Sequence, residues 1–204
     1  MLKQTFIELL SRYTHDQDLI TKFWTEIEQN YTQPKRYYHT LNHLEHLLQQ
    51  LTEVKSLLKD WDVMLFSLYY HDVIYNALKS DNEQKSAELA EKRMNEIGVP
   101  PSMITDCKAQ IMATKAHFWS ENADTNFFTD ADLSILGQSW EVYSQYFQHV
   151  RKEYSIYPDF MYNSGRKKVL KHFLAMEKIF KTAYFYDKFE QQARVNLEKE
   201  LKLY

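Results

Sequence analysis

Apolar side chains recur at intervals of three and four residues along most of the chain. Leu2, Phe6, Leu9 and Leu10 form the first such series. The same spacing recurs in later segments of the sequence: Leu19–Ile27, Leu41–Leu58, Ala87–Met94, Ile104–Met112, Leu133–Val150, Val169–Ile179 and Ala193–Leu201. Residues at this spacing share one face of a helix, and that apolar face must be buried against another element. The spacing therefore predicts an all-α protein built as a helical bundle.

The composition supports this prediction. The 204 residues include only three glycines and four prolines, which are too few for the turns of a many-stranded sheet. A chain of this length can bury a sizeable core without disulfides. No internal repeat and no low-complexity linker interrupts the sequence. We therefore expect a single domain over residues 1–204, with additional helices toward the C-terminal end.

Polar breaks and capping residues predict where several helices begin and end. Residues 31–38 contain a proline and are predicted as an irregular connection, after which a helix begins near Thr40. Ser80 and Asp81 are suitable N-cap residues for a later helix. Gly98 is suited to the C′ position that ends that helix.

The C-terminal half is less regular. We expect a polar loop over Ser120–Asn126 and a helix that starts at Asp132, with Asp130 as its cap. Tyr157–Gly165 is predicted as a further connection. Two more helices are expected within Lys167–Tyr204.

Several familiar functional motifs are excluded by residues that the chain lacks. Three scattered glycines cannot form a glycine-rich loop that cradles phosphates. Cys107 alone cannot supply the thiolates of a zinc finger, and the HLEH segment at His43–His46 has the wrong histidine spacing for a metalloprotease helix. The net charge of −3, with both signs interspersed, provides no basic field for an extended nucleic acid.

The sequence also bears on the compartment. Cys107 has no partner for an internal disulfide, so nothing requires an oxidising environment. Residues 1–13 include three charged side chains and lack the apolar core of a signal peptide. No apolar stretch approaches the length that spans a bilayer. We therefore expect a cytoplasmic protein that does not enter the membrane.

Histidine and carboxylate side chains are concentrated in otherwise apolar segments. The clearest case is WDVMLFSLYY, Trp61–Tyr70, which is followed directly by His71 and Asp72. A carboxylate that ends a buried helix is costly unless it is paired or binds a cation. Imidazole nitrogen and carboxylate oxygen together suit first-row divalent metals. The doublet is therefore predicted to belong to a metal site, the alternative being a buried helix cap.

The order His43, then His71 with Asp72, then Asp132 resembles the HD superfamily of metal-dependent phosphohydrolases, whose signature is a histidine, a His-Asp doublet and a distal aspartate. Within it, the sequence is similar to a bacterial subgroup described as predicted metal-dependent HD superfamily phosphohydrolases. The similar segments are RYYHTLNHLEHLL (36–48), YHDVIYN (70–76), SDNEQKSAELA (80–90), DADLSILG (130–137), VRKEYS (150–155), GRKKVLKHFL (165–174) and ARVNLEKEL (193–201). The resemblance implies an HD-domain-like helical bundle.

The resemblance further implies that His43, His71, Asp72 and Asp132 hold a divalent metal ion. Such ligands favour Mn, Fe, Co or Ni, with Mg or Zn possible. The implied reaction is hydrolysis of a small phosphoester, above all a nucleotide, by water that the metal activates. Asp72 or Glu83 would move the proton, making them the catalytic candidates. For Glu83, the alternative is a residue that only completes a helix N-terminus.

Five further residues are candidates for substrate binding: His39, Lys115, His117, Arg151 and Arg166. Guanidinium and ammonium groups can pair with phosphate oxygens, although each of the three basic residues could equally be a solvated surface charge. His39 could equally have a surface or capping role. His117 could instead serve a second metal ion, and His46 is expected to be structural.

Two other functions remain open. The chain could be a binding module that uses the metal to hold a nucleotide or signal with little turnover. Alternatively, the metal could be structural and the aromatic surface could serve protein association. Stabilisation by a ligand without product release would favour the first alternative, and a melting scan after metal removal would test the second. The oligomeric state is not predicted.

Overall fold

The computed structural model describes residues 1–204 and confirms the all-α prediction. It contains ten α-helices, two short 3-10 helices and no strand. Their bounds are α1 Leu2–Leu10, α2 Gln17–Tyr31, α3 Leu41–Glu53, η1 Lys55–Leu57, α4 Trp61–Tyr70, α5 Asn82–Glu96, α6 Pro101–Ala113, α7 Ala123–Leu133, η2 Ser134–Gly137, α8 Trp140–Glu153, α9 Asp159–Ala175 and α10 Ala183–Leu201.

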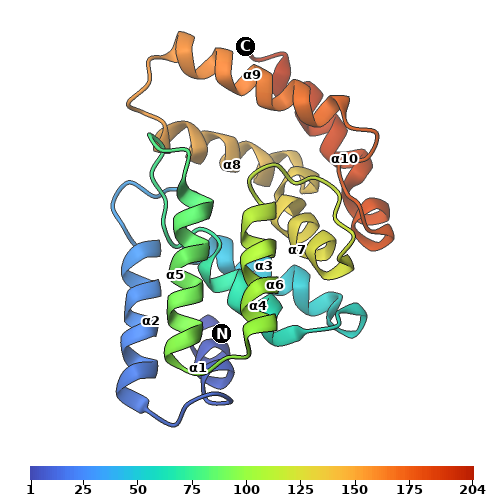
Figure 1. Ribbon diagram of the computed structural model, residues 1–204. Helices are drawn as coiled ribbons and strands as arrows, with labels where there is room; N and C mark the ends of the chain where they lie inside the picture. Colours follow the sequence, from blue (N-terminus) through green and yellow to red (C-terminus); the bar gives the residue numbers. More distant parts are fainter.

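The helices form a larger body and an outer layer. Figure 1 shows α1 to α7 in the lower body, with α8, α9 and α10 above them and α9 along the top. In the body, α4 packs against α1, α3, α5 and α6. Eight of its ten residues are buried, on all sides of the helix. The helix that precedes the His-Asp doublet is therefore the apolar centre of the fold, as its sequence predicts.

The C-terminal end of α5 is formed as predicted, but its N-terminal end lacks the predicted side-chain cap. Gly98 occupies the C′ position with φ 72°, and the N–H of Val99 donates to the carbonyl of Met94 at 3.0 Å. This is a glycine-dependent helix ending, because other residues rarely adopt a positive φ. Asp81 stands at the N-cap position, but its side chain caps no helix amide and pairs with Lys85 at 2.8 Å.

The predicted loop over Ser120–Asn126 and the helix start at Asp132 are wrong. α7 begins at Ala123 inside that segment, and Asn122 caps it by accepting a hydrogen bond from the N–H of Asp124. Asp132 lies in its last turn. The sequence pattern misleads because α7 buries several polar side chains, among them Asp124, whose carboxylate accepts hydrogen bonds from the backbone N–H groups of Lys59 and Asp60.

Asp130 shows how such a polar residue is used. The prediction that it caps its own helix is wrong, since it lies inside α7 and is fully buried. Its carboxylate accepts hydrogen bonds from the backbone N–H groups of Lys181 and Thr182, at 2.7–3.0 Å, and pairs with the Lys181 ammonium at 2.8 Å. Asp130 therefore fixes the two residues that directly precede α10, a helix distant in sequence.

The predicted connection over Tyr157–Gly165 is also wrong, because α9 begins at Asp159 and runs through Gly165. Its apolar residues Phe160, Met161 and Val169 are 76, 49 and 43% exposed. Only three residues of this helix are buried, so its sequence lacks the regular apolar face that would have revealed it. α9 packs mainly against α10.

Candidate metal centre

Three helices of the body bring two imidazoles and a carboxylate together. His43 lies in the first turn of α3, His71 is the C-cap residue of α4, and Asp132 ends α7. His43 Nε2 lies 3.0 Å from His71 Nε2 and 3.3 Å from Asp132 Oδ1, and His71 Nε2 lies 3.7 Å from the same oxygen. The three residues could hold a metal ion, because their ligand atoms all lie within 4.8 Å of one another.

The chemistry of this group fits a cation. His71 Nδ1 lies 3.0 Å from the carbonyl oxygen of Leu68, which can only accept a hydrogen bond. Nδ1 therefore carries a proton, and in the neutral imidazole, the form that binds metals, Nε2 would present its lone pair toward the other ligand atoms. Bonds of about 2.1 Å place neighbouring ligand atoms of an octahedral ion about 3.0 Å apart. The observed separations of 3.0, 3.3 and 3.7 Å begin at that value and exceed it by up to 0.7 Å.

Asp72 adjoins the group. Its Oδ2 lies 3.1 Å from His71 Nε2 and 3.8 Å from His43 Nε2. Its backbone is fixed by Arg36, a buried residue whose guanidinium donates to the carbonyl oxygens of Asp72 and Val73 at 2.7 and 2.8 Å. The structure thus brings all four predicted ligands together. The sequence reasoning overlooked Arg36, although it lies in the RYYH segment.

The electrostatics keep the carboxylates ionised. Burial opposes charge on Asp72, but the neighbouring His71 outweighs burial and lowers the pKa of the carboxyl group. Burial likewise opposes protonation of His71, yet the charge of Asp72 and its hydrogen bond raise the His71 pKa to about 9. For His43, burial prevails and lowers the pKa. For Asp132, hydrogen bonds with His117 and His43 overcome burial and lower the pKa.

His117 contacts the second oxygen of Asp132. Its Nε2 lies 2.9 Å from Asp132 Oδ2. The backbone of His117 has a φ of 54°, the only positive value at a residue other than glycine. Such a conformation is uncommon and usually persists where neighbouring contacts hold it. The structure therefore places this predicted residue beside the metal group.

His39 is held by a residue that the sequence reasoning missed. The Glu153 side chain is 1% exposed, and its Oε2 lies 2.6 Å from His39 Nδ1 and accepts a hydrogen bond from the Tyr75 hydroxyl. Its Oε1 accepts from the backbone N–H groups of Tyr37, Tyr38 and His39, at 2.8–3.0 Å. His39 Nε2 lies 3.9 Å from Asp72 Oδ2. A glutamate in the last turn of α8 opposes the helix dipole, which was the available clue.

A cavity of about 620 Å³ extends from this centre. Its lining includes His39, Asp72, His117 and Asp132 on the metal side. Beside them, at the start of α5 and the end of α6, it is lined by Lys79, Asn82, Glu83, Thr114 and Lys115. A smaller cavity of about 170 Å³, lined by His43 and His46 among others, also reaches Asp132. Of the three residues that could hold a metal ion, Asp132 therefore lines both cavities and His43 lines the smaller one.

The other predicted substrate-binding residues are placed differently. Lys115 lines the larger cavity and donates to the carbonyl oxygen of Ser80 at 2.7 Å. Arg166 also lines it, but its guanidinium is paired with the buried Glu200 at 2.8 and 2.9 Å. Arg151 is absent from the lining and pairs with Asp159 at 2.6 Å. Lys79 lines the cavity but was not singled out from the sequence.

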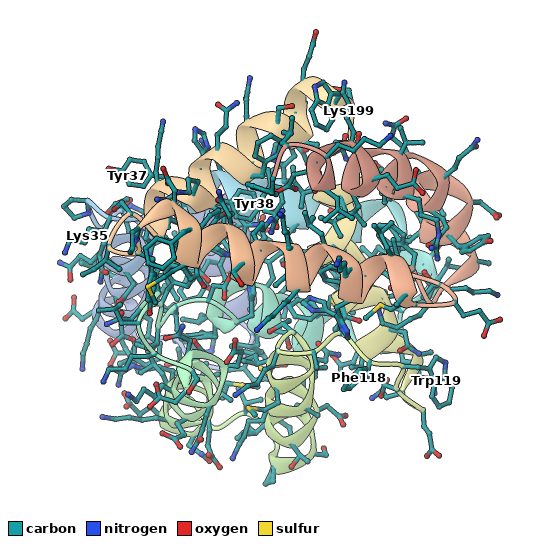
Figure 2. All side chains as sticks on the ribbon, turned by 90° about the horizontal axis from the view of Figure 1, so that it is seen from above. Lys35, Tyr37, Tyr38, Phe118, Trp119 and Lys199 are labelled. Carbon is teal, nitrogen blue, oxygen red and sulfur yellow. The ribbon has the colours of Figure 1, made fainter.

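The surface beside the centre is partly aromatic. Figure 2 shows Tyr38 toward the middle of the molecule and Tyr37 at its edge, with Phe118 and Trp119 at another edge. Phe118 and Trp119 are 65 and 69% exposed and directly follow His117.

No protein-family model matches the chain, and no curated protein or solved structure is similar enough to count as a match. The resemblance to HD phosphohydrolases thus stays a prediction that rests on the residues described above. None of the helices combines the length and the apolar character that crossing a membrane requires.

Proposed function

We propose that the protein is a metal-dependent phosphohydrolase that acts on a small phosphoester, with nucleotides as the favoured substrates. One observation carries the proposal: Asp132 of the His43, His71 and Asp132 group, and Asp72 beside this group, line a cavity that is also lined by two lysines. Nitrogen and oxygen ligands favour Mn, Fe, Co or Ni, with Mg or Zn possible. A bound divalent cation would polarise a phosphoryl group and make water more acidic.

The protein's own residues would bind and orient the phosphoester. Lys79 and Lys115 would offset the negative charge of the phosphoryl oxygens. His39 donates through Nδ1 to the Glu153 carboxylate, whose pKa is lowered to about 2 because its hydrogen bonds and the charge of His39 overcome burial. The Nε2 atom of His39 is therefore the one available to a substrate oxygen.

Two carboxylates are candidates for moving the proton. Asp72 lies among the ligands, where its Oδ2 contacts His71. Glu83 lines the same cavity from the first turn of α5. Hydrolysis takes a proton from the attacking water and delivers it to the leaving alcohol oxygen. An ionised carboxylate such as Asp72 could accept this proton from the water, and a carboxyl group that has gained a proton could pass it to the leaving oxygen. The catalytic roles of both residues are part of the proposal.

The test combines metal analysis with an assay of phosphate release. We would purify the protein after supplying Mn, measure its metal content, and assay nucleoside monophosphates and p-nitrophenyl phosphate. Asp132→Asn should lose the metal and lower turnover by more than about 100-fold. Mutating a residue that only hydrogen-bonds to a metal ligand already lowers metal affinity or activity by about 10–100-fold, and loss of the ligand itself should cost more. Asp106→Asn is the matched control, since Asp106 is exposed on α6.

The outcomes separate the possible functions. Near-stoichiometric metal and phosphate release that are both lost in Asp132→Asn would support the phosphohydrolase. Metal and nucleotide binding without product release would replace it with a binding module. Asp132→Asn with unchanged metal content and turnover would contradict the proposed centre.

A further inference from the structure

One wall of the large cavity is formed by a single face of α9. Met161, Gly165, Val169 and Phe173 all line the cavity and follow one another at four-residue intervals, so they lie along one side of the helix. Met161 and Val169 are 49 and 43% exposed, although both are apolar. The protein itself therefore leaves this apolar face uncovered. We call these four residues the α9 wall.

Gly165 lies at the middle of this wall without a local structural reason. It is in the interior of α9, where glycine is less favourable than alanine. It does not have a positive φ. A Cβ atom at this position would meet no atom within 4 Å, so close packing does not require glycine either. The glycine leaves a gap between Met161 and Val169, and that gap opens on the cavity.

The surroundings of the gap are aromatic and carry polar groups at their edges. Tyr154 and Tyr157 line the same cavity with their rings 6.2 Å apart and nearly parallel. Phe173 reaches toward the metal side, where its ring centre lies 6.4 Å from that of His117. The α9 wall and the metal centre thus belong to one continuous cavity of about 620 Å³, a size that accommodates a small organic ligand.

We propose that the α9 wall binds the group to which the phosphate is attached, and that this group is a planar heteroaromatic ring system such as a nucleobase. The inference rests on the proposed function in one respect, since the phosphoryl group is taken to lie at the metal centre. A planar ring seated in the gap at Gly165 would place its apolar faces against Met161 and Val169, with Phe173 one helical turn further along the same wall. Its heteroatoms can hydrogen-bond to the tyrosine hydroxyls. The gap at Gly165 provides the space for it.

The test uses two substrates that differ only in the ring. With the Mn-loaded protein, we would compare kcat/KM for nucleoside 5′-monophosphates and for ribose 5-phosphate. The best nucleotide should exceed ribose 5-phosphate by about tenfold or more, as stacking of a base on aromatic side chains suggests. Binding of the free nucleoside, measured by calorimetry, provides a readout that requires no turnover.

Three variants examine the wall. Gly165→Leu fills the gap and should lower kcat/KM for the nucleotide about tenfold or more while changing that for ribose 5-phosphate less than about twofold. Ser164→Leu is the matched control: it adds the same side chain at a neighbouring exposed residue of α9 that does not line the cavity, and it should keep both activities. Phe173→Leu removes a ring but keeps the bulk, and should weaken nucleoside binding with little effect on ribose 5-phosphate.

The results distinguish this inference from the proposed function. If ribose 5-phosphate is hydrolysed as efficiently as every nucleotide, and Gly165→Leu affects all substrates equally, the α9 wall does not bind a ring and the phosphohydrolase stands. If no phosphoester is hydrolysed but nucleosides bind and both Gly165→Leu and Phe173→Leu weaken binding, the wall stands and the phosphohydrolase does not. Absence of both binding and hydrolysis would overturn both.

Discussion

α4 carries the predicted metal-binding doublet and α9 forms a wall of the cavity beside it, yet the two helices are built in opposite ways. Eight of the ten residues of α4 are buried, against three of the seventeen in α9. A helix packed on all sides holds its C-cap residue in place, which suits ligand atoms that must keep fixed separations. A helix attached by few contacts can change its exposed residues without disturbing the core. We therefore expect the residues of the candidate metal centre to keep fixed positions, and the exposed residues of the α9 wall to tolerate substitution.

The largest expected effect concerns the attachment of α9. Arg166 donates to both oxygens of Glu200, and both residues are buried. Arg166→Met would leave the Glu200 carboxylate buried without its cationic partner, with only the hydroxyls of Tyr143 and Tyr204 still donating to it, so we expect a loss of about 3–5 kcal/mol in the free energy of unfolding. Urea denaturation followed by circular dichroism measures it.

A double variant serves as the control for this prediction. Arg166→Met combined with Glu200→Leu removes both charges, and it should recover part of the lost stability, because an apolar pair of similar size can replace a buried ion pair. The recovery is incomplete because the buried Tyr143 hydroxyl loses Glu200 as its acceptor. A cost below about 1 kcal/mol for the single variant would show that α9 is not anchored by this pair.

The second prediction tests the packing of α4. Leu68 is fully buried, and its carbonyl oxygen accepts the hydrogen bond that orients His71. Leu68→Ala should lower the free energy of unfolding by about 2–5 kcal/mol through the cavity that it creates. Val169→Ala on α9 should cost less than about 0.5 kcal/mol, since that side chain is half exposed. Equal costs in parallel urea titrations would abolish the contrast between the helices.

The third prediction concerns Glu153, which links α8 of the outer layer to residues 37–39 of the body. Its pKa is lowered to about 2: burial raises it, but His39 and the backbone amides lower it more. A lowered pKa means that the ionised group stabilises the fold above about pH 4.5 and that this stabilisation is lost as the pH falls toward 2. The shift corresponds to about 3 kcal/mol.

Urea denaturation between pH 3 and pH 7 measures this effect. The difference in unfolding free energy between the wild-type protein and Glu153→Gln should be greatest near neutral pH and should shrink as the solution is acidified. A difference that stays constant over this range would mean that Glu153 titrates normally and does not link the two regions electrostatically.

The sequence predicted the body better than the outer layer, and α4 and α9 show why. The apolar run Trp61–Tyr70 and the Gly98 helix ending are local patterns, and the structure has both. α9 could not be found in the same way, because its few buried residues include a charged one, Arg166, whose partner Glu200 is distant in sequence. Its start was therefore placed too late.

The candidate site shows the same division. The candidate ligands were selected by their order along the chain, and the structure brings His43, His71, Asp72 and Asp132 close together. Glu153 was not found, because its importance lies in its contacts with a segment more than a hundred residues earlier. Residues that support a site through the folded chain leave little trace in the local sequence.

The smallest expected effect compares the first turns of the two helices. Asp60 is the N-cap residue of α4 and accepts a hydrogen bond from the N–H of Val63 at 3.0 Å. Asp60→Ala should therefore cost about 1 kcal/mol of unfolding free energy. In α9 the N-cap residue is Pro158, which has no side-chain cap, and the following Asp159 is 81% exposed. Asp159→Ala should cost less than about 0.5 kcal/mol, because an exposed carboxylate interacts only weakly with the helix dipole and with Arg151. Urea titrations at matched pH compare the two variants. If Asp159→Ala cost more unfolding free energy than Asp60→Ala, the start of α9 would be held more firmly than its exposure indicates, and α9 would not be the more loosely attached of the two helices.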